Sequence, residues 1–282
     1  MRLRLWHAPD GARVAYRESG TAGTGPPIVL LHSCGLSHRE LEPVVEHLDD
    51  RFRIILPDLP LHGDSEDRPR HPYSLDWFAD VMGAFCRDVG GPRPLVGGHG
   101  MGAEILLHAT ATGRIDPGRL VLMANRLHRR PPHTLARTAL RTTARAAALP
   151  GLDRTLSRAA RLAIRPDAGL KLSARANPGA RDLIRHAMGD VGGNANLARS
   201  WSRFARRWPA DTNRQVLDQY RHVTVPTLLL WADRDNMHPL ATAEEALDLL
   251  PDGQLRTLPD TGFLVAYDDA VGVAREIAAF VV

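Results

Sequence analysis

The sequence predicts an α/β protein with a mostly parallel, doubly wound sheet. Several short, continuous apolar runs are typical of strands that are buried on both faces, as in a parallel sheet. These runs are residues 26–32, 52–58, 94–98, 119–125 and 226–233. Helix-like segments lie between them, including residues 74–90 and 101–113. In sheets of this class ligands bind beyond the carboxyl ends of the strands, so the residues that follow each strand are the candidate site.

The chain opens with a different pattern. In DGARVAYRESG (10–20), apolar and polar residues alternate after a glycine turn. This alternation predicts an antiparallel pair of strands ahead of the parallel sheet.

Residues 126–214 are predicted to form a helical cap inserted between two parts of the core. No comparable strand occurs between Asn125 and Val225, and segments 134–149 and 153–164 have helical patterns. The region holds 18 Arg, one Lys and five Asp, which gives +14, whereas the rest of the chain sums to 4 − 14 = −10. We therefore predict a core of residues 1–125 and 215–282 and an Arg-rich cap of residues 126–214.

Composition points to an ordinary globular protein. Of the 282 residues, 44% are hydrophobic and 24% charged, and no stretch of about 18 apolar residues predicts a membrane span. The opening MRLRLWHAPDG lacks the apolar run of a signal peptide, so we expect a cytoplasmic location. Two cysteines are too few for a disulfide framework, and the histidines have no metal-ligand spacing. We expect no metal or other cofactor, and no nucleic-acid partner, because no such motif is present.

Five further stretches carry the functional signal. They are LLHSCGLS (30–37), PDLPLHGDS (57–65), GHGMG (98–102), WADRDNMHP (231–239) and LPDTGFLVAYDDA (258–270). Together with the opening hairpin, and in this order, they resemble the α/β-hydrolase fold in its single-domain, capped form. The resemblance covers nearly all of the chain except the cap, and it implies the α/β-hydrolase fold for the core.

The resemblance also shows a departure from the family. It implies a nucleophilic Ser on a sharp strand-to-helix turn, a His that takes its proton, and an acid that orients the His. The Ser position corresponds to Gly100 and the His position to Phe263, and only Asp235 keeps the expected residue type. Since neither Gly nor Phe can attack a carbonyl or move a proton, ordinary Ser hydrolase chemistry is not expected.

The remaining frame could still bind an oxyanion. The amide of Met101 is expected at a helix N-terminus, and a second amide could come from Ser33 or Cys34. Loss of the Ser and His side chains should enlarge the pocket around Gly100, with Phe263 as an apolar wall. Ser33 and Cys34 could also be relocated nucleophiles, or could contribute only their backbone.

Each of four polar side chains near these loops has two interpretations. Asp235 could take a direct part in the chemistry or could be a structural relic bonded to backbone amides. His238, three residues later, could replace the missing base or could be an exposed loop residue. His32 and His99 flank the two site loops and could contact substrate or serve packing.

Three functions remain open at this point. The first is a non-hydrolytic, cofactor-independent enzyme of bacterial natural-product biosynthesis, performing a cyclisation, C–C bond-forming, lyase or isomerase step on an apolar or aromatic, polyketide-like substrate. Its Arg, Ala and Gly bias is typical of a GC-rich, actinomycete-like coding sequence, and the basic cap could meet an acyl carrier protein. The second is a catalytically inactive binder of a small ligand or partner. The third is a hydrolase with a relocated nucleophile.

Overall fold

The computed structural model describes most of the chain outside the predicted cap. The described residues are 1–19, 25–48, 51–66, 68, 70–125, 138, 142, 167–191, 200, 201, 203, 204 and 213–281.

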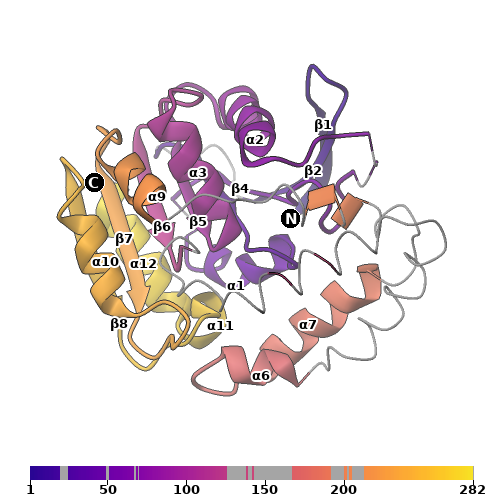
Figure 1. Ribbon diagram of the computed structural model, residues 1–282. Coiled ribbons are helices and arrows are strands. Elements are labelled where there is room, and N and C mark those ends of the chain that lie inside the picture. Colours follow the sequence, from indigo (N-terminus) through magenta and orange to yellow (C-terminus); the bar gives the residue numbers. More distant parts are fainter. Residues whose placement is uncertain are drawn as a thin grey trace.

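One sheet of eight strands forms the centre of the molecule, in the order β1-β2-β4-β3-β5-β6-β7-β8 (Figure 1). The strands are β1 Arg2–His7, β2 Arg13–Ser19, β3 Ile28–Leu31, β4 Ile54–Pro57, β5 Leu95–His99, β6 Arg119–Met123, β7 Thr227–Ala232 and β8 Gly253–Leu258. β2 pairs antiparallel with β1 and β4, and every other pairing is parallel. The prediction of a mostly parallel, doubly wound sheet is confirmed.

Strand burial explains why five of the parallel strands could be read from the sequence. β3, β4, β5 and β7 are buried along their full length, and β6 along all but its first residue. The sixth, β8, lies at the edge of the sheet and exposes Gln254, Arg256 and Thr257, so it carries no continuous apolar run. For that reason β8 could not be predicted from an apolar run.

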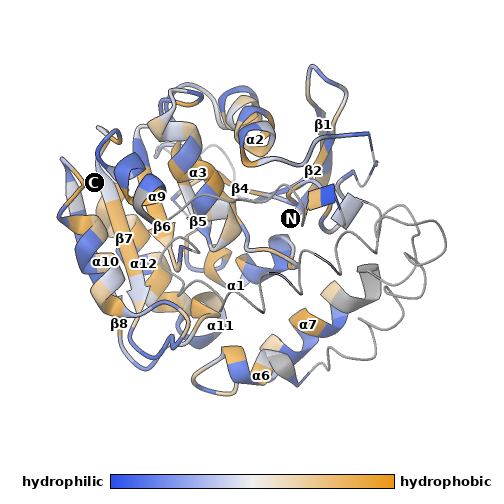
Figure 2. Cartoon of the chain, in the orientation of Figure 1, coloured by the Kyte–Doolittle hydropathy of each residue, from blue (hydrophilic) through white to orange (hydrophobic). Residues whose placement is uncertain are grey.

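Helices cover both faces of the sheet, and their apolar sides supply two cores. On one face, α2 (Leu75–Gly90) and α3 (Met101–Ala111) pack together with α9 (Asn213–Tyr220) and α10 (Leu240–Leu247). On the other face lie α1 (Glu42–Val45), α11 (Val265–Asp268) and α12 (Ala270–Val281). Figure 2 shows that the strands are largely hydrophobic, whereas the helices around them carry both hydrophobic and hydrophilic residues. Among the described helices, none is long and apolar enough to cross a bilayer.

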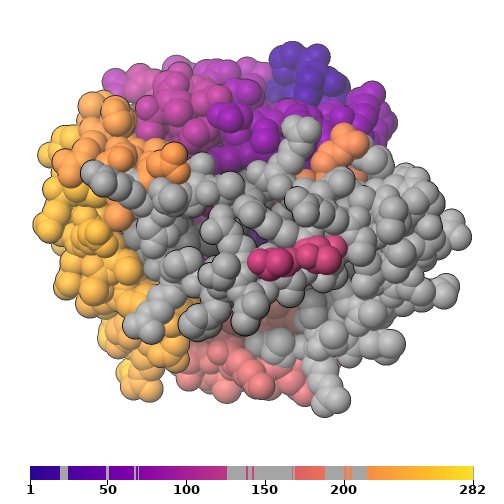
Figure 3. Space-filling model, in the orientation of Figure 1, coloured from indigo at the N-terminus to yellow at the C-terminus, as the bar shows by residue number. Residues whose placement is uncertain are grey.

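Two described helices fall inside the predicted cap: α6 (Ala168–Leu172) and α7 (Pro178–Val191), which form the lower edge of the face in Figure 3. The buried carboxylate of Asp268 ties the segment between them to the core. It accepts hydrogen bonds from the Ser173 hydroxyl, from the amides of Ala174 and Arg175, and from the amide of Gly262. Apart from Thr138 and Thr142, which are helical, the segments 134–149 and 153–164 lie outside the described residues, so the domain boundaries stay a prediction.

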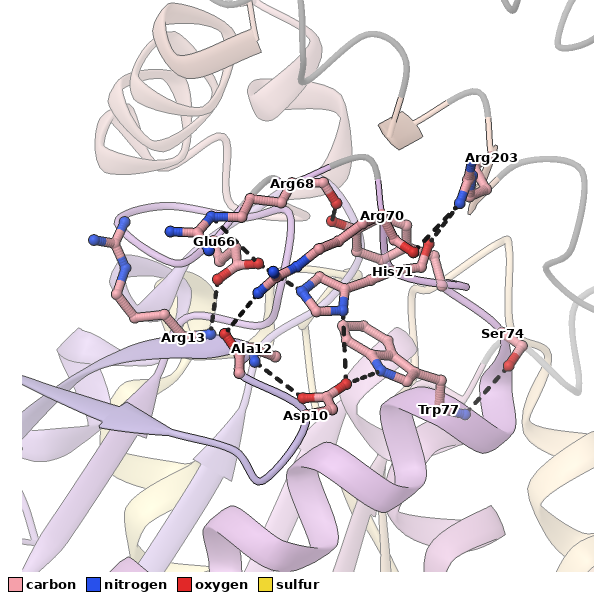
Figure 4. Close-up of polar contacts among 12 residues, drawn as sticks. Asp10, Ala12, Arg13, Glu66, Arg68, Arg70, His71, Ser74, Trp77 and Arg203 are labelled. Atoms are coloured by element: carbon pink, nitrogen blue, oxygen red, sulfur yellow. Dashed lines mark hydrogen bonds and ion pairs between the residues drawn. The ribbon is translucent and has the colours of Figure 1, made fainter.

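A polar cluster fastens the β1–β2 turn to the start of α2 (Figure 4). Nε2 of the buried His71 ring lies 2.5 Å from the Glu66 carboxylate, and Nδ1 lies 3.6 Å from the Asp10 carboxylate. The ring also stacks on Trp77. The Trp77 indole in turn donates to Asp10, and Arg203 donates to the carbonyl of His71. Because these bonds are made within the cluster, we assign it a structural role.

Candidate functional site

The strand-to-helix turn between β5 and α3 keeps the geometry of a sharp elbow. Gly100 sits at its apex with φ 53° and ψ −113°, in the region that favours glycine. Backbone bonds hold the turn on both sides: the Gly100 amide donates to Met123 at 3.0 Å and the Gly102 amide to His32 at 3.1 Å. The turn therefore persists without any side chain at its apex.

The space above Gly100 is filled from the neighbouring loops. A Cβ placed on Gly100 would lie 2.8 Å from the Cβ of Ser33 and 3.7 Å from the Cζ of Phe263. The first distance is shorter than two carbons tolerate, so any side chain at position 100 requires Ser33 to move. Ser33 and Phe263 therefore border the position of the missing side chain, and the expected enlargement of the pocket stays a prediction.

The amide of Met101 is the clearest oxyanion-type donor of the site. It begins α3, the 11-residue helix that follows Gly100. Among the described residues it has no hydrogen-bond acceptor, whereas the neighbouring amides of Gly100 and Gly102 are both bonded. A free amide at a helix N-terminus favours negative charge on a ligand.

The expected second amide is more restricted. The Ser33 amide and hydroxyl both donate to the carboxylate of Glu40, at 2.6 and 2.7 Å, so neither is free for a ligand in this arrangement. The Gly35 amide donates to His62. Cys34 is exposed in this loop, and an oxyanion role for its amide stays a prediction.

Glu40 is the centre of a buried polar group that also includes His99. The carboxylate is 1% exposed and lies 2.7 Å from Nδ1 of His99. Burial alone would raise the pKa of Glu40, but the charge of His99 and the hydrogen bonds from His99 and Ser33 outweigh it, and the pKa is lowered. Glu40 is therefore a carboxylate that joins the Ser33 loop to the end of β5.

His32 is committed to the backbone. Its Nδ1 contacts the carbonyl of Ser33 at 2.8 Å, and its Nε2 accepts from the amide of Leu59 at 2.9 Å. Burial is the main reason that its pKa is lowered, which keeps the ring neutral. With both nitrogens bonded, His32 positions the loops and has no free polar atom to offer a ligand.

Asp235 and His238 form a second carboxylate–imidazole pair. Oδ2 of Asp235 lies 2.6 Å from Nδ1 of His238, and Oδ1 accepts from the Met237 amide. Burial would raise the pKa of Asp235, but the hydrogen bond and charge of His238, the Met237 amide and the charge of His99 together lower it. His238 is 3% exposed, so the expected alternative of an exposed loop histidine is wrong.

Phe263 brings the two pairs together. Its ring centroid lies 4.5 Å from that of His99 and 5.6 Å from that of His238, on which it stacks at 22°. The ring also packs against an apolar cluster that includes Leu183 and Ile184 of α7. The structure thus groups Gly100, Ser33, His99, Phe263 and His238 within one small volume.

The family model for the alpha/beta hydrolase fold matches residues 26–270, which is most of the chain. The chain belongs to the α/β-hydrolase fold family. An esterase from Thermogutta terrifontis superposes on this α/β-hydrolase-fold chain with a TM-score of 0.76 and 21% identity, covering 99% of this chain and 98% of that one. The enol-lactonase from Burkholderia xenovorans LB400 gives a TM-score of 0.74 and 20% identity over 98% and 99%.

Two curated proteins are similar in sequence to this α/β-hydrolase-fold chain. The magnesium-chelatase 30 kDa subunit of Rhodobacter capsulatus is 34% identical over 83 residues, which are 29% of each chain. The pimeloyl-[acyl-carrier protein] methyl ester esterase of Chromobacterium violaceum is 28% identical over 245 residues, 85% of this chain and 87% of that protein. None of the relatives named here is a cyclase or a lyase.

Glu40 is the site residue of this α/β-hydrolase-fold chain that the sequence did not reveal. It lies in the single-turn η1 helix (His38–Glu40), in a run of mixed polar residues with no periodicity that would place it inside. Its spacing of seven residues from Ser33 matches no motif considered above. Only the three hydrogen bonds it accepts identify it.

Asp58 should dominate the acid sensitivity of the loop after β4. Burial would raise its pKa, but the hydrogen bond and charge of His38 hold the pKa at about 2, against 3.8 for a free Asp. Because the folded-state pKa is depressed, the stabilisation is present above pH 3.8 and is lost as the pH falls toward 2. We expect about 2 kcal/mol of unfolding free energy to disappear across this window.

Chemical denaturation at pH 4 and pH 2 measures this loss, with Asp58→Asn as the variant. The variant should be less stable than the wild type at pH 4, and its stability should depend less on pH across the window. An equal pH dependence in both proteins would contradict the assignment to Asp58.

Proposed function

We propose that this chain is a non-hydrolytic enzyme on the α/β-hydrolase fold, in which Gly100 stands at the nucleophile position of the family and Phe263 at its histidine position. It acts without a cofactor on an apolar or aromatic carbonyl compound of bacterial natural-product metabolism, such as a polyketide-like substrate. The reaction is a cyclisation, C–C bond formation, elimination or isomerisation that begins with removal of a proton next to the carbonyl.

The bond between Asp235 and His238 carries this proposal. A carboxylate that holds Nδ1 of a buried histidine leaves Nε2 as the proton acceptor, which is the arrangement of a general base. No partner of Nε2 is found among the described residues, and the ring stacks on Phe263. The acid of the family thus retains an imidazole partner although position 263 has none.

The chemistry follows from these groups. Nε2 of His238 takes a proton from the carbon beside the carbonyl, and the electron pair of the broken C–H bond moves to the carbonyl oxygen. The Met101 amide stabilises the resulting enolate oxygen. The enolate then attacks an electrophilic carbon of the same molecule, expels a β-substituent, or is reprotonated at another carbon, and His238 returns the proton.

Family membership and the esterase relative of Chromobacterium violaceum support an enzyme rather than an inactive binder. That relative is named for an ester carried on an acyl carrier protein. An acyl chain delivered by a carrier protein would suit a basic cap, so we include an acyl carrier protein among the proposed partners.

A hydrolase with a relocated nucleophile is the second candidate, and one observation favours it. The Cβ of Ser33 lies only 2.8 Å from where a Cβ on Gly100 would be, so its hydroxyl starts close to the position of the missing serine. Against it, the Ser33 hydroxyl donates to Glu40, and within the part of the chain that the structure describes no histidine nitrogen is hydrogen-bonded to it. A fluorophosphonate probe decides between the two, because covalent labelling of Ser33 would support the hydrolase.

Hydrogen–deuterium exchange tests the proposed proton removal without knowledge of the natural product. The protein is incubated in D2O with a panel of apolar aromatic ketones that includes 1-tetralone, and deuterium beside the carbonyl is followed by mass spectrometry. We expect exchange on the order of a hundredfold faster than in buffer. His238→Gln and Asp235→Asn should both return the rate to the buffer value.

His222→Gln is the matched control, because His222 is exposed and the one bond that its side chain makes to a described residue is to the carbonyl of Asp218. It should exchange at the wild-type rate. If no ketone of the panel exchanges faster with wild-type protein than in buffer, the enzymatic proposal fails and the binding role gains support.

A further inference from the structure

His99 holds a buried nitrogen that the fold does not use. Its Nδ1 bonds Glu40, but its Nε2 is fully buried and has no hydrogen-bond partner among the described residues. A buried polar atom without a partner costs about 1–3 kcal/mol, so such atoms are rare in folded proteins. The lack of a partner for this nitrogen therefore requires an explanation.

The surroundings of His99 place that nitrogen at the candidate site. His99 directly precedes Gly100, and its ring centroid lies 4.5 Å from that of Phe263. The tip of the same Phe263 ring comes within 3.7 Å of a Cβ placed on Gly100. The His99 ring, the apex of the elbow and Phe263 thus lie against one another, and the Met101 amide begins the helix that starts there.

Glu40 determines which way the His99 ring presents its proton. When the ring is neutral, the ionised carboxylate favours the tautomer with its hydrogen on Nδ1, and Nε2 then has a lone pair. The carboxylate itself is held by the amide and hydroxyl of Ser33, so the ring is fixed in this orientation. The matching ligand group is a hydroxyl that can donate a hydrogen bond.

We propose that Nε2 of His99 binds the acidic hydroxyl of a ligand, an enol or a phenol, and that Glu40 is the residue that positions His99 for it. The inference deepens the proposed function by naming the substrate class, and it rests on that function only in placing the ligand in the same site. Two carboxylate–imidazole pairs then serve different atoms: His238 faces a C–H bond and His99 an O–H bond.

The proton balance of this step is simple. The O–H bond of the ligand breaks, its proton forms a bond to Nε2, and the electron pair stays on the ligand oxygen. The imidazolium is paired with Glu40 on one side and with the new oxyanion on the other. The Met101 amide offers a further donor to that oxyanion.

Binding of 4-nitrophenol tests the inference directly, because its anion absorbs visible light and its neutral form does not. The phenol is titrated into wild-type protein at a pH below its own pKa. We expect saturable binding with the yellow band of the phenolate. His99→Gln should weaken binding at least tenfold and remove the band from any ligand that still binds.

Glu40→Gln is the second variant and tests positioning. A glutamine can still fill the space, but it cannot accept every bond that the carboxylate accepts, so we expect the phenolate band to shrink. His222→Gln, on the surface, should bind and colour the phenol as the wild type does. Thermal unfolding of each variant shows that it is folded.

Nitrogen-15 NMR of the histidine rings provides a readout that a purely structural role would not move. In wild-type protein the Nε2 signal of His99 should move to the protonated range when 4-nitrophenol binds, and the Nδ1 signal should stay. A colourless complex, an unchanged Nε2 signal, or equal binding by a folded His99→Gln variant would each overturn the inference.

The two proposals fail in different ways. Loss of ketone exchange with retained phenolate binding would reject the proposed reaction and leave the His99 site intact. Retained exchange without a phenolate band would reject the His99 site and leave the reaction intact.

Discussion

The combined substitution Gly100→Ser, Phe263→His and Ser33→Gly is expected to give the chain esterase activity on 4-nitrophenyl acetate. The first two changes supply a nucleophile and a base at the positions that our proposal assigns to them, and Asp235 is the proposed acid. The third change removes the Ser33 Cβ, which would lie 2.8 Å from the Cβ of the new serine. We expect a gain on the order of a hundredfold over wild type, as a positioned base provides.

Two partial variants serve as controls. Gly100→Ser alone should show no activity and should lose about 1–3 kcal/mol of stability, because it combines a left-handed φ of 53° with the Ser33 contact. Gly100→Ser with Phe263→His should be impaired by the same contact. A folded triple variant that a fluorophosphonate probe does not label would contradict the placing of Gly100 and Phe263 at the two catalytic positions.

Removing the carboxylate of Glu40 is expected to have the largest effect on stability. Glu40→Ala leaves three donors without an acceptor in the interior: the Ser33 amide, the Ser33 hydroxyl and Nδ1 of His99. It also removes the partner of a buried histidine. We expect a loss of about 3–5 kcal/mol in the free energy of unfolding, measured by chemical denaturation at neutral pH.

Glu46→Ala is the matched control, because Glu46 is exposed and lies only six residues away. It should change the unfolding free energy by less than about 0.5 kcal/mol. A loss below about 1 kcal/mol for Glu40→Ala would show that water can satisfy the three donors. It would contradict the inference from burial that water is excluded from them.

Strand positions and strand type were predictable where the sequence pattern reflects burial. The parallel strands from β3 to β7 are apolar because both faces are covered, and the antiparallel start alternates because one face of β2 is more open. The edge strand β8 and the helix α12 were not predicted. β8 alternates exposed and half-buried residues, so its sequence resembles that of a loop.

The site was predictable only where a motif fixes a position along the chain. The places of Gly100, Met101 and Asp235 in the fold were predictable because each follows a predicted strand at a set distance, and that of Phe263 because it lies in a motif of the family; their roles stay predictions. The contacts of Glu40 could not be predicted in this way, because they join residues 33, 40 and 99. These residues approach one another only through the pairing of β3 with β5. The burial of His238 likewise follows from tertiary packing and leaves no local pattern.

The close approach of Ser33 to the apex of the elbow bears on how such a chain can change over generations. A single codon change that placed a serine at position 100 would meet the Ser33 Cβ at 2.8 Å and would gain no base. A side chain at position 100 therefore requires a compensating change at Ser33. While both residues are present, sterics alone disfavour any larger residue at position 100, so we expect the two positions to change together.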